Sequence, residues 1–127
     1  MSGASNTLYC AYCSVTGGEG NSVFAQYSSV TGGTDNYITY AATYAFIGGG
    51  STNTVDAVDY AIIVGGQQNS VSADGAVVLG SFASALHDNA AVFGFGSNST
   101  NVCESMAEDS LTVCARGGFF VNGVDLA

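Results

Sequence analysis

YCSVTGGEGNSV at 12–23 is the first of four copies of one pattern. The other three are YSSVTGGTDNYI at 27–38, YAFIGGGSTNTV at 44–55 and YAIIVGGQQNSV at 60–71. The pattern reads Tyr-small-x-[Val/Ile]-x-Gly-Gly-x-x-Asn-x-[Val/Ile], and it weakens in GAVVLGSFASAL at 75–86 and NAAVFGFGSNST at 89–100. Successive copies start 15, 17, 16, 15 and 14 residues apart. Self-similarity at such an interval is the sequence signature of a repeat architecture.

Each copy contains two short stretches rich in β-branched residues, divided by Gly-Gly on one side and by a polar run on the other. β-branched residues favour strands, whereas Gly and small polar residues favour turns. One copy therefore predicts one coil with two strands and no helix. We expect an all-β protein: a short β-solenoid, or β-roll, of about six coils of 14–17 residues, in one domain of the 127-residue chain.

Alternation along the strands predicts which side chains fill the interior. In the first strand of each coil a small residue is followed two positions later by a β-branched one. The small residues are Cys13, Ser28, Ala45, Ala61, Ala76 and Ala90, and the β-branched residues are Val15, Val30, Ile47, Ile63, Val78 and Val92. The second strands contribute Val23, Ile38, Val55, Val71 and Leu86. Such pairs are typical of a narrow, packed interior.

An asparagine recurs at one corner of the coils. Its copies are Asn21, Asn36, Asn53, Asn69 and Asn98. Strands in neighbouring coils lie about 4.8 Å apart, so identical amides at one corner bond from coil to coil. We predict a structural asparagine ladder.

The outward positions of the first strand change character along the chain. They are Ser14/Thr16 and Ser29/Thr31 in the first two coils, and from the third coil on they are mostly apolar. The apolar ones are Phe46, Ile62, Val64, Val77, Leu79 and Phe93. Strands that are apolar on both faces need cover on both sides, and no helix is predicted to supply it. We therefore expect a homotrimer with these six residues at the subunit interface, because thin coils gain stability mainly from neighbours.

The charge balance excludes two classes of partner. The chain has ten acidic residues, a single basic residue, Arg116, and a formal net charge of −9. One cation cannot neutralise a run of phosphates, which excludes nucleic acid. An anionic membrane is a poor partner for the same reason, and no apolar run is long enough for membrane insertion.

The repeats at roughly 9–102 resemble the head repeats of trimeric autotransporter adhesins and the similar Gly-Gly-x-x-Asn repeats of phage and virus tail fibres. AVVLGSFASAL and AAVFGFGSNST look like the 14-residue adhesin coil, and the four Gly-Gly-x-x-Asn coils look like the fibre version. The resemblance implies a homotrimer of β-rolls about a common axis, with a function in attachment. DSLTVCARGGFFVNGVDLA at 109–127 resembles a segment that follows such repeats in fibres, although Cys114 takes the usual Arg position.

The two ends are expected to serve assembly. Residues 1–8 lack the basic region of a secretory leader, so we expect an N-terminal arm that inserts into a particle assembled without secretion. Residues 103–127 are expected to form a C-terminal cap or docking segment. Its cap residues are Arg116, Phe119, Phe120 and Leu126, and Arg116 is expected to pair with Glu104, Glu108 or Asp109 within the trimer.

The sequence gives less support for a catalytic or metal site than for a structural role. Cys10-x-x-Cys13 has no second pair at zinc spacing, and His87 alone does not complete a site, so we expect reduced, packed cysteines with a Cys103–Cys114 disulfide as the alternative. Acidic residues near the coil corners suggest calcium binding, but the nine-residue repeat motif of calcium-binding solenoids does not occur in the sequence. Those acids are Asp35, Asp56, Asp59, Asp74 and Asp88. We expect no enzyme and no cofactor.

The sequence therefore predicts a structural protein of the virion surface: a trimeric spike, tail-fibre segment or capsid-decoration fibre. Its expected partners are two further copies of itself, other virion proteins through the N-terminal arm, and a host surface glycan. The alternative is an extracellular filament or bacterial surface adhesin subunit. A calcium- or ice-binding solenoid comes third, since the hydroxyl rows of the first two coils end at Phe46 and Gly48.

Overall fold

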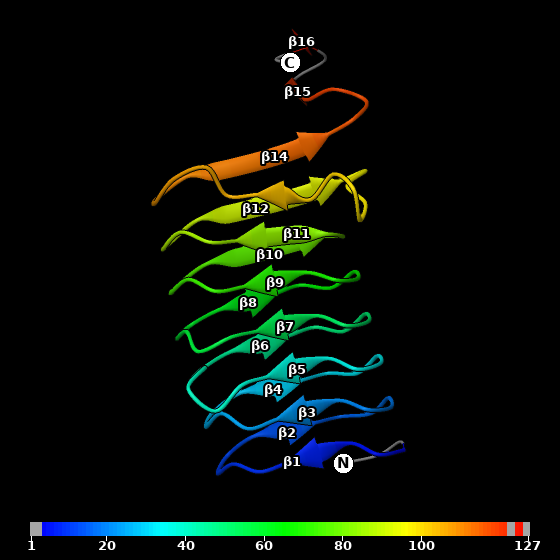
Figure 1. The fold of residues 1–127 in the computed structure, drawn as a ribbon, viewed down its shortest axis with the longest axis vertical. Coiled ribbons are helices and arrows are strands. Elements are labelled where there is room, and N and C mark those ends of the chain that lie inside the picture. The colour runs from blue at the N-terminus through cyan, green and yellow to red at the C-terminus, as the bar shows by residue number, and fades with distance from the viewer. Residues whose placement is uncertain (1–3, 122–123, 126–127) are drawn as a thin grey trace.

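The computed structural model describes residues 4–121 and 124–125 of the chain. Two seven-stranded parallel sheets, here called sheet A and sheet B, lie face to face, and the chain alternates between them (Figure 1). No helix occurs among the described residues. The predicted all-β solenoid is confirmed, with about seven coils instead of six.

Among strands β1 to β14, sheet A contains the odd-numbered strands and sheet B the even-numbered ones. Those of sheet A are β1 (Thr7–Leu8), β3 (Ser22–Val23), β5 (Tyr37–Ile38), β7 (Thr54–Val55), β9 (Ser70–Val71), β11 (Ala83–Ala85) and β13 (Cys103–Glu104). Those of sheet B are β2 (Ser14–Val15), β4 (Ser29–Val30), β6 (Phe46–Ile47), β8 (Ile62–Ile63), β10 (Val77–Gly80), β12 (Ala91–Phe95) and β14 (Leu111–Ala115). A short antiparallel hairpin of β15 (Phe120–Val121) and β16 (Val124–Asp125) follows.

The solenoid extends past residues 9 and 102, the limits expected from the repeats. At the N-terminal end β1 pairs with β3, so Thr7 and Leu8 belong to sheet A. At the other end β13 pairs with β11, and β14 pairs with β12 over five residues. The segment assigned to a cap therefore contributes one more coil.

Like residues stack on like residues in the interior. Val15 pairs with Val30, Val30 with Ile47 and Ile47 with Ile63, and these side chains are almost fully buried. The facing column from sheet A and the column of small residues are buried as well. Their buried members are Val23, Ile38, Val55, Val71, Ser28, Ala45, Ala61, Ala76 and Ala90. Cys13 is half-buried, since it lies in the first coil.

One interior position was predicted wrongly. Leu86 is 48% exposed, and Ala85 takes the interior position opposite Val71. The turn before this strand is one residue shorter than in the earlier coils, with Gly80 alone where they carry Gly-Gly. Because successive strand residues point to opposite faces, a shift by one residue turns Leu86 outward.

The Gly-Gly turns bring the backbones of neighbouring coils into close approach. Gly33 has a φ of +87°, and a Cβ there would overlap the carbonyl oxygen of Gly50 in the next coil. Only glycine meets both conditions without strain. The second glycine of each pair is therefore a requirement of the turn, whereas a Cβ at the first, as at Gly32, would meet open space.

Candidate functional site

Buried amides form a continuous row through the Gly-Gly corner of the solenoid. The Asn36 backbone N–H and side-chain amide donate to Asn21 Oδ1 at 3.1 and 2.9 Å, and Asn36 Oδ1 accepts the same two bonds from Asn53. The Asn36 amide also donates to the carbonyl oxygens of Gly32 and Gly50 at 3.0 Å. The row is a structural element: each rung satisfies backbone groups of two neighbouring coils.

The row contains one residue that the repeat did not indicate and lacks one that it did. Asn6 supplies the first rung, because its Oδ1 accepts the Asn21 backbone N–H at 3.0 Å. The row ends at Asn69, whose Oδ1 accepts the Ala83 N–H. Asn98 was predicted wrongly: its Oδ1 accepts bonds from Thr100 and Asn101 within a longer turn.

The outer face of sheet B carries an apolar surface from β6 to β14. Phe46, Ile62 and Val64 are 39%, 37% and 48% exposed in the single chain. The other predicted interface residues, Val77, Leu79 and Phe93, are half-buried on the same face. The pairing of β12 with β14 adds two residues that the sequence assigned to the cap. They are Leu111 and Val113, aligned with Ala91 and Phe93.

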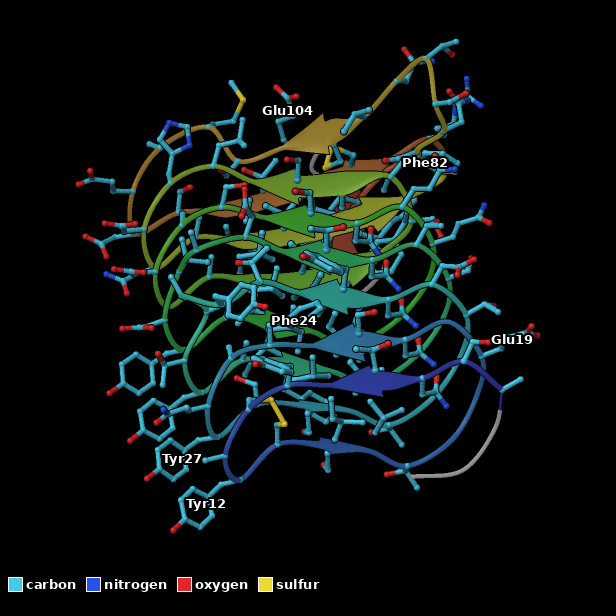
Figure 2. All side chains as sticks on the ribbon, turned by 60° about the horizontal axis from the view of Figure 1, so that its bottom comes forward. Tyr12, Glu19, Phe24, Tyr27, Phe82 and Glu104 are labelled. Carbon is cyan, nitrogen blue, oxygen red and sulfur yellow. A yellow bond between two sulfur atoms is a disulfide. The ribbon has the colours of Figure 1, made fainter. Side chains whose placement is uncertain are left out.

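Four tyrosines form a column at the corner between sheet A and sheet B. Adjacent rings in the series Tyr12, Tyr27, Tyr44 and Tyr60 have centroids 5.1 Å apart, with interplanar angles of 4°, 11° and 4°. Figure 2 shows Tyr12 and Tyr27 side by side at this corner, pointing away from the solenoid. The repeat contained the signal for this column, one Tyr per coil at a constant position.

Acidic side chains take over this corner in the later coils. The backbone N–H of Thr43 donates to Asp59 Oδ1 at 3.0 Å, that of Asp59 to Asp74 Oδ1 at 2.8 Å, and that of Asp74 to Asp88 Oδ1 at 2.9 Å. These carboxylates therefore satisfy backbone donors of the preceding coil. In the described part of the chain no group of three or more acidic, His or Cys side chains is arranged to hold a metal ion.

The cysteines form two disulfides, Cys10–Cys13 and Cys103–Cys114, with Cα atoms 5.8 Å apart in each. The expectation of reduced cysteines is therefore wrong, and the Cys103–Cys114 disulfide that the sequence left as the alternative is confirmed. Cys10–Cys13 closes the turn between β1 and β2, and Cys103–Cys114 joins β13 to β14 across the interior. Both bonds lie in the end coils, which have a neighbouring coil on one side only and so have less packing to hold them.

A pocket of about 280 Å³ lies at the C-terminal end of the solenoid, lined in part by Phe95, Ser97 and Arg116. Ser97 Oγ is buried there without a hydrogen-bond partner. Within the described residues, no ion pair of the single chain joins Arg116 to the acids expected to bind it. Phe119 and Phe120 are exposed, and the fourth predicted cap residue, Leu126, lies outside the described residues.

His87 contacts a serine that sequence reasoning did not pair with it. Its Nδ1 lies 2.8 Å from Ser105 Oγ, which also accepts the Leu86 N–H at 2.9 Å. Ser105 is only 4% exposed, and within residues 4–121 and 124–125 no carboxylate bonds to the His87 ring. A nucleophilic triad needs an accessible serine and an acid that orients the histidine, and this pair has neither.

No protein-family model, no curated protein and no solved structure matches this chain. The described residues also include no helix with the length and apolarity needed to cross a bilayer. The surfaces of the solenoid itself are therefore the features from which a function can be inferred.

Proposed function

We propose that the chain is a structural, non-enzymatic module that assembles as a homotrimer through the outer face of sheet B. The observation that carries this proposal is the apolar surface from β6 to β14, defined by Phe46, Ile62, Val64, Val77, Leu79, Phe93, Leu111 and Val113. It crosses five adjacent strands, β6, β8, β10, β12 and β14, at about 4.8 Å per strand. Contiguous apolar surface of this kind marks a site of association, because water is a poor solvent for it.

The first two coils provide an internal reference for this argument. Ser14 on β2 and Ser29 on β4, with Thr16 and Thr31 directly after these strands, occupy the same outward positions as the apolar residues of later coils. The fold therefore tolerates polar side chains on this face. Apolar ones in the later coils stabilise contacts outside the single chain, and the resemblance to trimeric β-rolls supports three copies.

The two disulfides support a location outside a reducing cytosol, since such bonds persist in oxidising surroundings. Together with the resemblance, they support a spike or fibre segment on the surface of a virion, in contact with other particle proteins and a host glycan. Arg116 would pair with a carboxylate of a neighbouring copy in this assembly.

The test is the molecular mass of the purified chain by light scattering, for the natural sequence and for a variant with Ile62→Ser, Val64→Thr and Leu79→Thr. These substitutions install the residue types that the first two coils carry at the same positions. The natural chain is expected to be trimeric and the variant monomeric. A control with Ser29→Thr and Thr31→Ser should stay trimeric. A natural chain that is monomeric, or a trimer unaffected by the apolar-to-polar variant, would contradict the proposal.

An end-to-end filament is the second candidate. Strands β1 and β2 are the outermost strands of their sheets, so each has an edge without a strand neighbour among the described residues. Such edges are templates for pairing with another copy. Light scattering separates the two candidates, because a filament grows with protein concentration whereas a trimer keeps one mass.

A further inference from the structure

All seven tyrosines of the chain lie between residues 9 and 60, and four of them form the column of Tyr12, Tyr27, Tyr44 and Tyr60. Between 48% and 79% of each of these four side chains is exposed. Three successive pairs of nearly parallel rings repeat the same 5.1 Å spacing. The column therefore holds phenols in repeated, solvent-accessible contact from coil to coil (Figure 2).

The turn itself does not require tyrosine at this corner. The four tyrosines have φ between 55° and 59°, a left-handed conformation that is costly for a bulky residue. The same corner in later coils carries Gly75, Asn89 and Asp109, also with positive φ. Gly, Asn and Asp adopt this conformation most readily. Four tyrosines here point to a use of the phenol rings beyond forming the turn.

We propose that this column is a site of oxidative tyrosine coupling, which joins successive coils of one chain through dityrosine bonds. A peroxide, acting through a peroxidase, takes one electron and one proton from each of two neighbouring phenols. The two radicals form a carbon–carbon bond between the ring positions adjacent to the hydroxyl groups, and both rings regain aromaticity by moving a proton from carbon to oxygen. One peroxide is reduced to two waters, and the linked pair is two hydrogen atoms lighter.

The arrangement of the other tyrosines is unsuited to this coupling. Tyr9 and Tyr40 meet edge to face at 6.4 Å and 77°, and Phe24 is the ring neighbour of both Tyr37 and Tyr40. Phenylalanine has no phenol to oxidise. Among the seven tyrosines, only those of the column each have a phenol neighbour at 5.1 Å with a nearly parallel ring.

Covalent coupling would reach coils that the disulfides do not. The disulfides lie at residues 10–13 and 103–114, in the two end coils. The chain has no lysine for amine-based cross-links, because its one basic residue is Arg116. The oxidising surroundings that preserve disulfides also suit phenol coupling. The inference needs only a single chain and does not depend on the trimer.

The experiment treats the intact, disulfide-bonded protein with peroxidase and hydrogen peroxide at high dilution, which disfavours coupling between chains. Dityrosine is read by its fluorescence, and the linked peptides are identified by mass. One variant replaces Tyr12, Tyr27, Tyr44 and Tyr60 with Phe, which keeps the ring stack and removes the phenols. The matched control replaces Tyr9, Tyr37 and Tyr40 with Phe and leaves the column intact.

The natural chain and the matched control are expected to form dityrosine within one chain, with links Tyr12–Tyr27, Tyr27–Tyr44 or Tyr44–Tyr60. The column variant is expected to lose most of the signal while its circular dichroism spectrum stays unchanged. Linked protein should also melt at a higher temperature than untreated protein, because each link closes a loop in the unfolded chain. The inference is overturned if the column variant keeps its signal, if the links involve Tyr9, Tyr37 or Tyr40, or if coupling occurs only between chains.

Discussion

The first two coils and the last three present different outer surfaces on one backbone. Strands β2 and β4 carry Ser outward, each is followed by an exposed Thr, and both lie next to the tyrosine column. Strands β10, β12 and β14 carry apolar residues outward and follow an acidic corner. The interiors hardly differ, since Val15 and Val92 occupy equivalent buried positions. Interior side chains and turn residues therefore determine the fold, and the outward positions are free to carry function.

The largest effect is expected where the two regions share a feature, in the buried asparagine row. Asn36→Leu removes the acceptor of the Asn53 N–H and a donor to the Gly32 carbonyl. An unsatisfied buried polar group costs about 1–3 kcal/mol, so we expect a loss of about 3–5 kcal/mol in the free energy of unfolding. Urea denaturation measures it.

Asn98→Ala is the control for that substitution. Asn98 is half-buried in a turn outside the row, and its Oδ1 accepts bonds from Thr100 and Asn101, which can bond to water instead, so we expect a loss of about 1 kcal/mol. Equal losses for the two variants would mean that the amide row does not stabilise the solenoid.

The second largest effect is expected from removing the disulfides, which lie at opposite ends of the solenoid. Cys103–Cys114 spans 11 residues and Cys10–Cys13 only three. Loop-closure entropy grows with loop length. Replacing Cys103 and Cys114 with serines should therefore lower the free energy of unfolding by about 3 kcal/mol, and replacing Cys10 and Cys13 by about 2 kcal/mol. Urea denaturation of the two double variants gives the order, and the reverse order would show that the N-terminal coil depends more on its cross-link.

The smallest loss of stability is expected when a tyrosine of the column is replaced by a residue that later coils carry at the same corner. Tyr27→Asn removes two ring contacts, each worth about 0.5–1.5 kcal/mol, and introduces a residue that accepts the left-handed conformation more easily. We expect a net loss near 1 kcal/mol by thermal denaturation. A loss above about 3 kcal/mol would be the size of a core truncation and would contradict the external position of the ring.

The sequence predicts most of this fold because each coil repeats the same few requirements. Gly33, Asn36 and Val30 belong to a pattern that recurs in register, so the interior and the amide row follow from the period. The predictions are wrong where the coil length changes: a shorter turn exposes Leu86, and a longer one removes Asn98 from the row.

The functional surfaces are less predictable, because they depend on contacts between segments that the repeat does not encode. Cys103 and Cys114 belong to different sheets, and their bond requires that β13 and β14 continue the solenoid. Leu111 joins the apolar surface for the same reason. The tyrosine column was implicit in the period, but the stacking of its rings follows only from the geometry of the corner.

In the proposed trimer, two further copies of the chain cover the apolar surface from β6 to β14. Sedimentation equilibrium of the purified protein in non-reducing buffer tests this arrangement most directly. A single species of three times the 12.7 kDa chain mass is the expected result. A well-folded species of 12.7 kDa that stays soluble at high concentration would contradict it.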